Sequence, residues 1–111
     1  MRLSTVVAPL LALLSCAAAA DVERGRALLA QYQCGSCHAI PGVPASRGTV
    51  AQPLGAWSQR SYIAGHVPNR VELLARWIVA PQALVPGTTM PAMGVSPADA
   101  QAMAAYLFSL E

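Results

Sequence analysis

The sequence predicts an all-α domain of three main helices joined by long loops. Three segments place apolar residues at helical spacing, and no segment alternates apolar and polar residues convincingly enough to predict a strand. Between the helical segments, the stretches 39–59 and 81–95 are rich in proline and glycine. Long loops in a compact domain need a surface on which to pack, so the domain is expected to enclose something besides its own helices.

The first twenty residues have the pattern of an export signal. Arg2 supplies a positive charge, the stretch Val6–Leu14 is apolar but too short for a permanent membrane span, and three alanines precede Asp21 as a cleavage site. We therefore expect a signal peptide at 1–20 and a mature domain at 21–111 that is released into the periplasm. A buried N-terminal helix is the alternative.

The same segment also resembles the lipoprotein box of bacteria, through Leu13-Leu14-Ser15-Cys16. If that box is used, Cys16 becomes a lipidated first residue and the protein is anchored to the membrane while still facing the periplasm.

Length and composition indicate which kinds of small domain the mature part can be. About 90 residues are marginal for a self-sufficient hydrophobic core, and such domains usually contain a disulfide, a metal or a cofactor. The chain has no lysine, and its seven basic and five acidic residues give a net charge of +2. It has no basic run, so we expect no nucleic-acid partner.

Each helix has its own signals. The first is predicted over Asp21–Gln33, capped by Asp21, with Gly25 permitting close approach of another helix. Its apolar face is Ala27, Leu28, Leu29 and Tyr32. One short helical turn is expected at 60–64.

The second helix is predicted over Asn69–Ala80, with Asn69 as N-cap and Glu72 completing a capping box, and Pro81 stops it. Its apolar stripe is Val71, Leu74, Trp77 and Ile78. The last helix starts at the Ser96 cap, with Pro97 and Asp99 in its first turn. Its buried face is Met103, Tyr106, Leu107 and Leu110.

The motif that carries chemistry is Cys34-Gly35-Ser36-Cys37-His38. C-x-x-C-H is the attachment signature of haem c. Residues at i, i+3 and i+4 lie on one side of a helical turn, so two thiols reach the vinyl groups at one porphyrin edge and the imidazole points at the iron.

Three other interpretations of these residues fit the sequence less well. A Cys34–Cys37 disulfide leaves His38 and the long loops unexplained. A thioredoxin-like redox pair needs a strand–turn–helix context that this sequence lacks. A structural zinc site needs four protein ligands, and His66 has no second ligand near it in the sequence.

Over essentially the whole mature part, the sequence resembles the class I cytochromes c, and is similar to the haem c domain at the end of subunit II of some bacterial cytochrome c oxidases. The resemblance rests on the C-x-x-C-H motif and on Gly25, Pro53-Leu54, Arg60, Tyr62-Ile63-Ala64-Gly65, Pro68-Asn69, Arg76-Trp77-Ile78, Pro81, Pro86-Gly87-Thr88-Thr89-Met90-Pro91 and Ala105-Tyr106-Leu107. It implies a class I cytochrome c fold, in which the three helices and long loops wrap around one covalently bound haem.

The resemblance also implies roles for single residues. Cys34 and Cys37 would bind the haem covalently, and His38 and Met90 would be the two axial ligands of the iron. The remaining expectations are that Thr88 and Arg60 contact the haem propionates, that Trp77 packs against the haem, and that Gly25, Leu29 and Tyr106 form the crossing of the first and last helices. Arg60 could instead be a solvated surface charge.

Rival ligands and departures from the family pattern exist. Met93 and His66 are alternative sixth ligands. Where the family has Gly-Pro, this chain has Ala51-Gln52, although the Gln52 carbonyl could still accept a hydrogen bond from Nδ1 of His38. The absence of lysine argues against strongly electrostatic docking to partners.

These residues imply a one-electron carrier of the periplasmic respiratory chain that donates to a terminal oxidase, rather than an enzyme, because His/Met ligation leaves no open iron position. Its partners are expected to be redox proteins, either an oxidase or a dehydrogenase. The alternative function is a cytochrome subunit of a periplasmic dehydrogenase complex. A gas sensor or peroxidase would need an open site.

Overall fold

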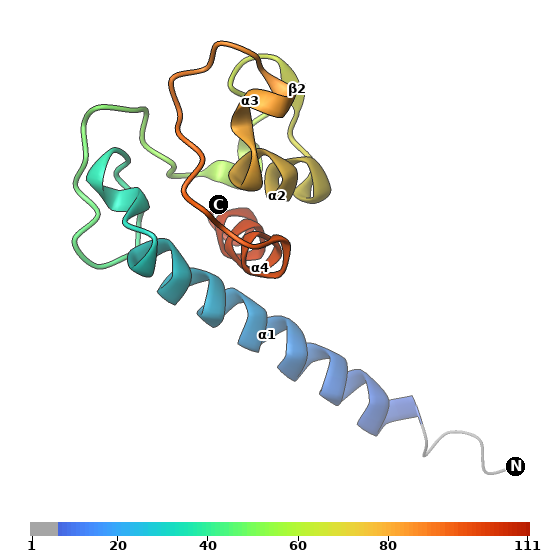
Figure 1. Cartoon of the computed structure of the whole chain (residues 1–111). Coiled ribbons are helices and arrows are strands. Elements are labelled where there is room, and N and C mark those ends of the chain that lie inside the picture. Colours follow the sequence, from blue (N-terminus) through green and yellow to red (C-terminus); the bar gives the residue numbers. More distant parts are fainter. Residues whose placement is uncertain (1–6) are drawn as a thin grey trace, which may run out of the picture.

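A computed structural model describes residues 7–111. The expected positive charge at Arg2 and the first residue of the apolar stretch, Val6, lie outside the described residues. The elements are mostly helical, as the sequence predicts (Figure 1). In chain order they are α1 Val7–Gln31, the 3-10 turns η1 Cys34–Ser36 and η2 Trp57–Gln59, strands β1 Tyr62–Ile63 and β2 Val67–Pro68, and helices α2 Val71–Val79, α3 Pro81–Leu84 and α4 Pro97–Phe108.

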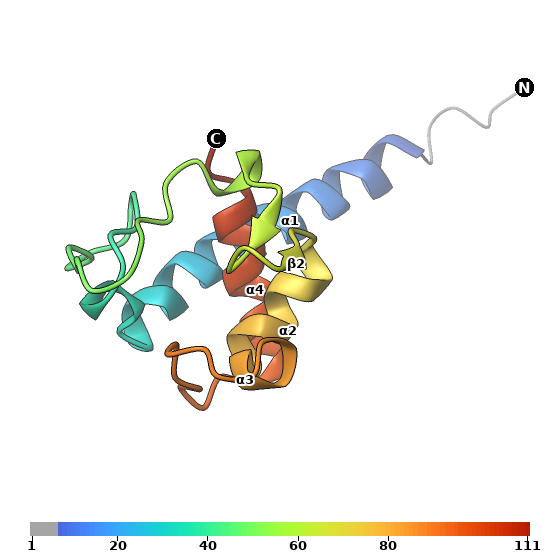
Figure 2. The ribbon, with the colours of Figure 1, turned by 90° about the horizontal axis from the view of Figure 1, so that it is seen from above.

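The domain is organised around α4, which packs against both α1 and α2 (Figures 1 and 2). At the crossing of α1 and α4 a Cβ atom on Gly25 would lie 1.9 Å from the carbonyl oxygen of Ala102, so only glycine fits there. Leu29 and Tyr106 are buried on the same two helices. The expected close approach at Gly25 is confirmed.

The first turn of α4 is held to α1 through Asp99. One carboxylate oxygen of Asp99 accepts a hydrogen bond from the hydroxyl of Tyr32 at 2.8 Å, and the other forms an ion pair with Arg24 at 3.1 Å. The hydrogen bond to the Asp99 carboxylate raises the pKa of Tyr32, because ionising the phenol would lose it. The predicted cap is confirmed, since the Ser96 hydroxyl accepts the backbone N–H of Asp99 at 3.1 Å.

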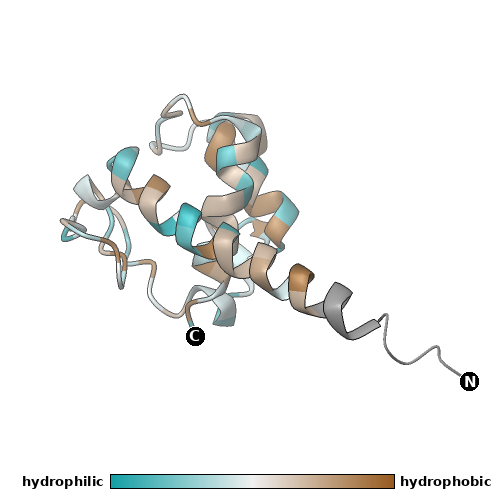
Figure 3. Cartoon of the chain, turned by 90° about the horizontal axis from the view of Figure 1, so that it is seen from below, coloured by the Kyte–Doolittle hydropathy of each residue, from teal (hydrophilic) through white to brown (hydrophobic). Residues whose placement is uncertain are grey.

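Helix α1 starts earlier than predicted, so Asp21 lies inside the helix and does not cap it. The residues before Asp21 include four consecutive alanines, the best helix formers, and the helix continues through them. Residues 12–21 are exposed, and from residue 12 onward the first buried residue is Gly25. Figure 3 shows hydrophobic colouring on the projecting part of α1, where Leu13 and Leu14 are 68% and 61% exposed.

None of the helices in residues 7–111 combines the length and hydrophobicity that a membrane span requires.

The start of α2 also differs from the prediction. Asn69 is not the N-cap and Glu72 completes no capping box, because the amide of Asn69 donates to the carbonyls of Trp57 and Arg60 instead, at 3.2 and 3.0 Å. Arg70 occupies the N-cap position without a side-chain cap. Of the predicted apolar stripe, Leu74, Trp77 and Ile78 are buried, whereas Val71 is 40% exposed.

Two loop predictions were wrong in detail. The helical turn expected at 60–64 is a minimal antiparallel hairpin of β1 and β2, because Ala64 and Gly65 have positive φ, which a helical turn does not allow. Pro81 ends α2 as predicted but also starts the short helix α3, since proline suits the first position of a helix. The remaining loop before α4 is irregular.

Candidate functional site

A cavity of about 450 Å³ lies among the 33–38 segment, the loop at 50–54, the loop at 88–93 and the inner faces of α2 and α4. This volume is in the range of small-molecule and cofactor sites. The interior surfaces are apolar, and the buried lining residues include Leu74, Ile78, Met103 and Leu107. The cavity therefore lies between loops that have little regular structure of their own, and it is the surface on which they pack.

The C-x-x-C-H motif lines this cavity at the end of α1. Gln33 adopts a left-handed conformation with φ of 58°, which turns the chain from α1 into η1. The backbone N–H groups of Cys37 and His38 both donate to the carbonyl of Cys34, at 3.3 and 3.0 Å, so the motif forms a compact helical turn as predicted. Both thiols are free, and burial raises the pKa of Cys34.

The loop that follows is bound closely to the motif. Gly48 donates its N–H to the carbonyl of Gly35 and Ala51 donates to the carbonyl of Cys37, each at 2.9 Å. A Cβ atom on Gly48 would lie 2.3 Å from the carbonyl carbon of Cys37, so the two backbones are in direct contact. These contacts position the next residue, Gln52, beside the histidine.

His38 is oriented by Gln52. Nδ1 of His38 lies 2.7 Å from the Gln52 carbonyl oxygen, which only accepts, so Nδ1 carries the proton. The other ring nitrogen, Nε2, is then unprotonated and has a lone pair free to bind a metal. The non-proline residue at this position therefore retains the hydrogen bond.

Three of the remaining site candidates line the cavity from α2 and from the loop before α4. Trp77 is buried, Met90 and Thr88 are half-buried, and the amide of Gln82 donates to the carbonyl of Met90 at 2.7 Å. Met93 also lines the cavity but is 45% exposed. His66 does not line it, and neither does Arg60.

Arg60 instead supports a residue that sequence reasoning missed. Its guanidinium lies 4.9 Å from the ring centroid of Trp57 and donates to the carbonyls of Pro53 and Gly55. Trp57 is buried and lines the cavity, and its Nε1–H has no protein acceptor. The only sequence signal for Trp57 was a large aromatic residue within a proline- and glycine-rich loop, close to an arginine.

The orphaned Nε1–H of Trp57 tests what the cavity holds. A buried donor without an acceptor is costly, so its partner is expected to come from a bound group that carries an acceptor such as a carboxylate. An apolar cavity, two free thiols, an imidazole with a free Nε2 and a thioether fit a large, mostly apolar, iron-containing cofactor with carboxylate side groups. The residues present fit haem.

The exposed lining residues outside the motif form the rim of the cavity, and none of them is charged. They are Gln33, Val50, Gln52, Thr89, Pro91 and Met93.

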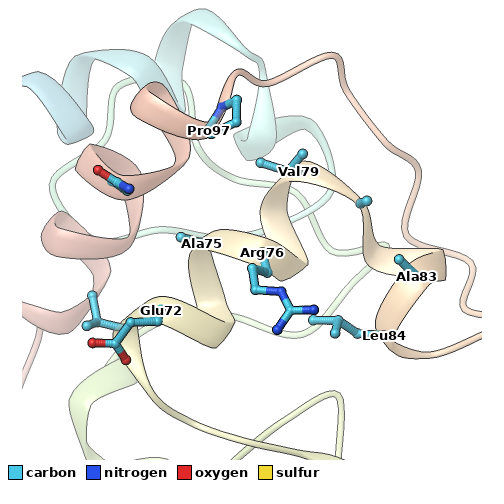
Figure 4. Close-up of a pocket in the computed structure, with 10 residues that line it drawn as sticks. Glu72, Ala75, Arg76, Val79, Ala83, Leu84 and Pro97 are labelled. Carbon is cyan, nitrogen blue, oxygen red and sulfur yellow. The ribbon is translucent and has the colours of Figure 1, made fainter.

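A second hollow lies on the other face of α2, between α3 and the start of α4 (Figure 4). Arg76 extends over it toward Leu84, and no predicted site residue lines it. Among residues 7–111, no three His, Cys, Asp or Glu side chains are grouped to hold a metal ion, so the zinc alternative finds no support.

Comparison with known proteins agrees with this chemistry. The family model described as cytochrome c matches residues 22–111. The chain belongs to the cytochrome c family. This cytochrome c is also 38% identical over 91 residues to cytochrome c oxidase subunit 2 of Alkalihalophilus pseudofirmus, in a match that covers 80% of this chain. The match covers only 25% of the length of that relative. No solved structure matches this chain significantly.

Membership of the family identifies the cofactor as covalently bound haem c and the general activity as electron transfer. Cys34 and Cys37 stand where that attachment requires them. Thus the resemblance deduced from the sequence, the class I fold and the cofactor are confirmed.

Proposed function

We propose that this cytochrome c is a one-electron carrier of the periplasmic respiratory chain that delivers electrons to a terminal oxidase. The observation that carries the proposal is that His38 and Met90 line the same cavity as the attachment cysteines. If His38 and Met90 both bound the haem iron, no iron position would be open to oxygen or peroxide, so the site would suit electron transfer rather than catalysis.

Each group of the chain has a definite task in this proposal. Haem c supplies the reversible one-electron change when bound. Cys34 and Cys37 hold the cofactor covalently, and the hydrogen bond to Gln52 keeps the His38 ring in one orientation and strengthens it as a donor. With haem bound, the apolar interior and a Met90 thioether would favour the reduced state, because both would disfavour the extra positive charge of ferric iron.

The delivery to an oxidase is supported by the similarity to an oxidase subunit. Export is supported by the leader pattern and by the burial along α1. Removal of residues 1–20 would take away only exposed side chains among those described, because burial begins at Gly25. Lipidation of the exposed Cys16 is the alternative route to the same compartment, with a membrane tether.

The axial ligands are tested with two methionine variants. Methionine sulfur on ferric haem gives a weak far-red absorption band, which should be present in the wild type, persist in Met93→Leu and vanish in Met90→Ala. Met90→Ala should also bind carbon monoxide in the ferrous form, because the sixth position opens.

Met93→Leu is the matched control, since both methionines line the cavity. If Met93→Leu loses the band and Met90→Ala keeps it, the ligand assignment is wrong. If the wild type lacks the band and binds carbon monoxide quickly, the carrier proposal itself fails.

A further inference from the structure

The rim of the haem cavity is uncharged and partly apolar. Val50 is 84% exposed and Met93 is 45% exposed, although both are hydrophobic. Pro91 is also exposed, and the remaining rim residues are neutral polar side chains. Hydrophobic residues gathered around one opening of a small domain indicate a surface that is covered by a partner.

No Arg, Asp or Glu side chain of residues 7–111 lines this opening. Arg24 pairs with Asp99 where α1 meets α4, and Arg26 pairs with Glu23 within α1. Arg60 is turned toward backbone carbonyls and the Trp57 ring. Apart from the haem ligand His38, no ionisable side chain other than the two cysteines lines the cavity among residues 7–111.

We propose that the rim is the docking surface for the redox partner and that this partner presents an uncharged, largely apolar face. The inference rests on the proposed function, because electrons must cross where the haem cavity reaches the surface. A charged partner face would lose hydration against the rim without gaining an opposite charge, which disfavours binding. Burial of apolar surface around Val50 stabilises the complex instead.

Substitutions at Val50 separate apolar from electrostatic docking. The experiment follows oxidation of the reduced holoprotein by membranes from its source cells, over a range of ionic strength. Val50→Glu and Val50→Lys should both slow oxidation, each about tenfold, because either charge must be desolvated in the complex. The wild-type rate should change less than about threefold with salt, because no Arg, Asp or Glu side chain of the described residues lines the docking surface.

Val71→Glu is the matched control. Val71 is also an exposed valine, but it lies on the other face of α2 beside the second hollow, so its replacement should leave the rate unchanged. The reduction potential of each variant is measured so that rates are compared at equal driving force.

The proposal of an apolar docking surface is overturned by any of three results. These are changes of the oxidation rate in opposite directions in Val50→Glu and Val50→Lys, no change of the rate in either variant, or a steep dependence of the wild-type rate on salt. If the membranes do not oxidise the wild type, delivery to an oxidase fails. In that case the same variants are tested in the opposite direction. The rate at which membranes supplied with NADH reduce each ferric holoprotein then shows whether the rim is an apolar docking surface. Membranes that neither oxidise nor reduce the wild type overturn both proposals.

Discussion

The crossing of α1 and α4 at Gly25 gives a quantitative prediction. In Gly25→Ala the new Cβ would lie 1.9 Å from the Ala102 oxygen and 2.6 Å from its carbonyl carbon, so the helices must separate by roughly 1.5 Å to restore ordinary contact. The obstacle is backbone and cannot move aside as a flexible side chain does. Overpacking of this kind costs up to about 3 kcal/mol, against about 1 kcal/mol gained from the helix propensity of alanine.

The net destabilisation of about 2 kcal/mol should lower the melting temperature by roughly 8–16 °C. Thermal unfolding of the ferric holoprotein, followed by far-UV circular dichroism, measures it. Gly55→Ala is the control, because its Cβ would lie at an ordinary 3.5 Å from Pro41 and should change stability by less than about 0.5 kcal/mol. The packing argument is refuted if Gly25→Ala melts at or above the wild-type temperature, or if Gly55→Ala loses as much.

Three further predictions concern the cap, the cavity and the leader. Ser96→Ala removes the acceptor for the Asp99 N–H and should lower the unfolding free energy in urea by about 1 kcal/mol; an unchanged midpoint would contradict the cap. Trp57→Phe keeps an aromatic ring but removes the orphaned Nε1–H donor, so a haem carboxylate that this donor stabilises in the wild type should titrate at higher pH in the variant. The reduction potential of the variant should therefore begin to change with pH at a higher pH than that of the wild type. Identical profiles for the two proteins would show that Trp57 contacts no haem carboxylate. Intact mass of the mature protein should correspond to a start at Asp21, whereas a diacylglyceryl group on Cys16 would show a lipid anchor instead.

Local patterns in the sequence were sufficient to predict that α1, α2 and α4 exist and that the attachment motif forms a helical turn. Capping by Ser96 involves residues three apart, and the compact turn of Cys34, Cys37 and His38 involves residues three and four apart. Interactions over such short separations depend little on the rest of the chain. Gly25 was also readable, because glycine inside a helical pattern costs stability and is typical of a close helix crossing.

Contacts between residues distant in the sequence decided the rest. Asn69 is an excellent cap by type, but the carbonyls of Trp57 and Arg60 come within its reach only in the folded chain and take its amide. The same holds for the Gln52 carbonyl beside His38 and for Trp57, which lines the cavity and whose buried Nε1–H has no partner among the described residues. The sequence by itself determined that the chain binds haem c, because the motif is local. Only the tertiary structure decided how the histidine is held, which residues enclose the cofactor and which uncharged surface surrounds it, because each of these depends on loops that pack around a common cavity.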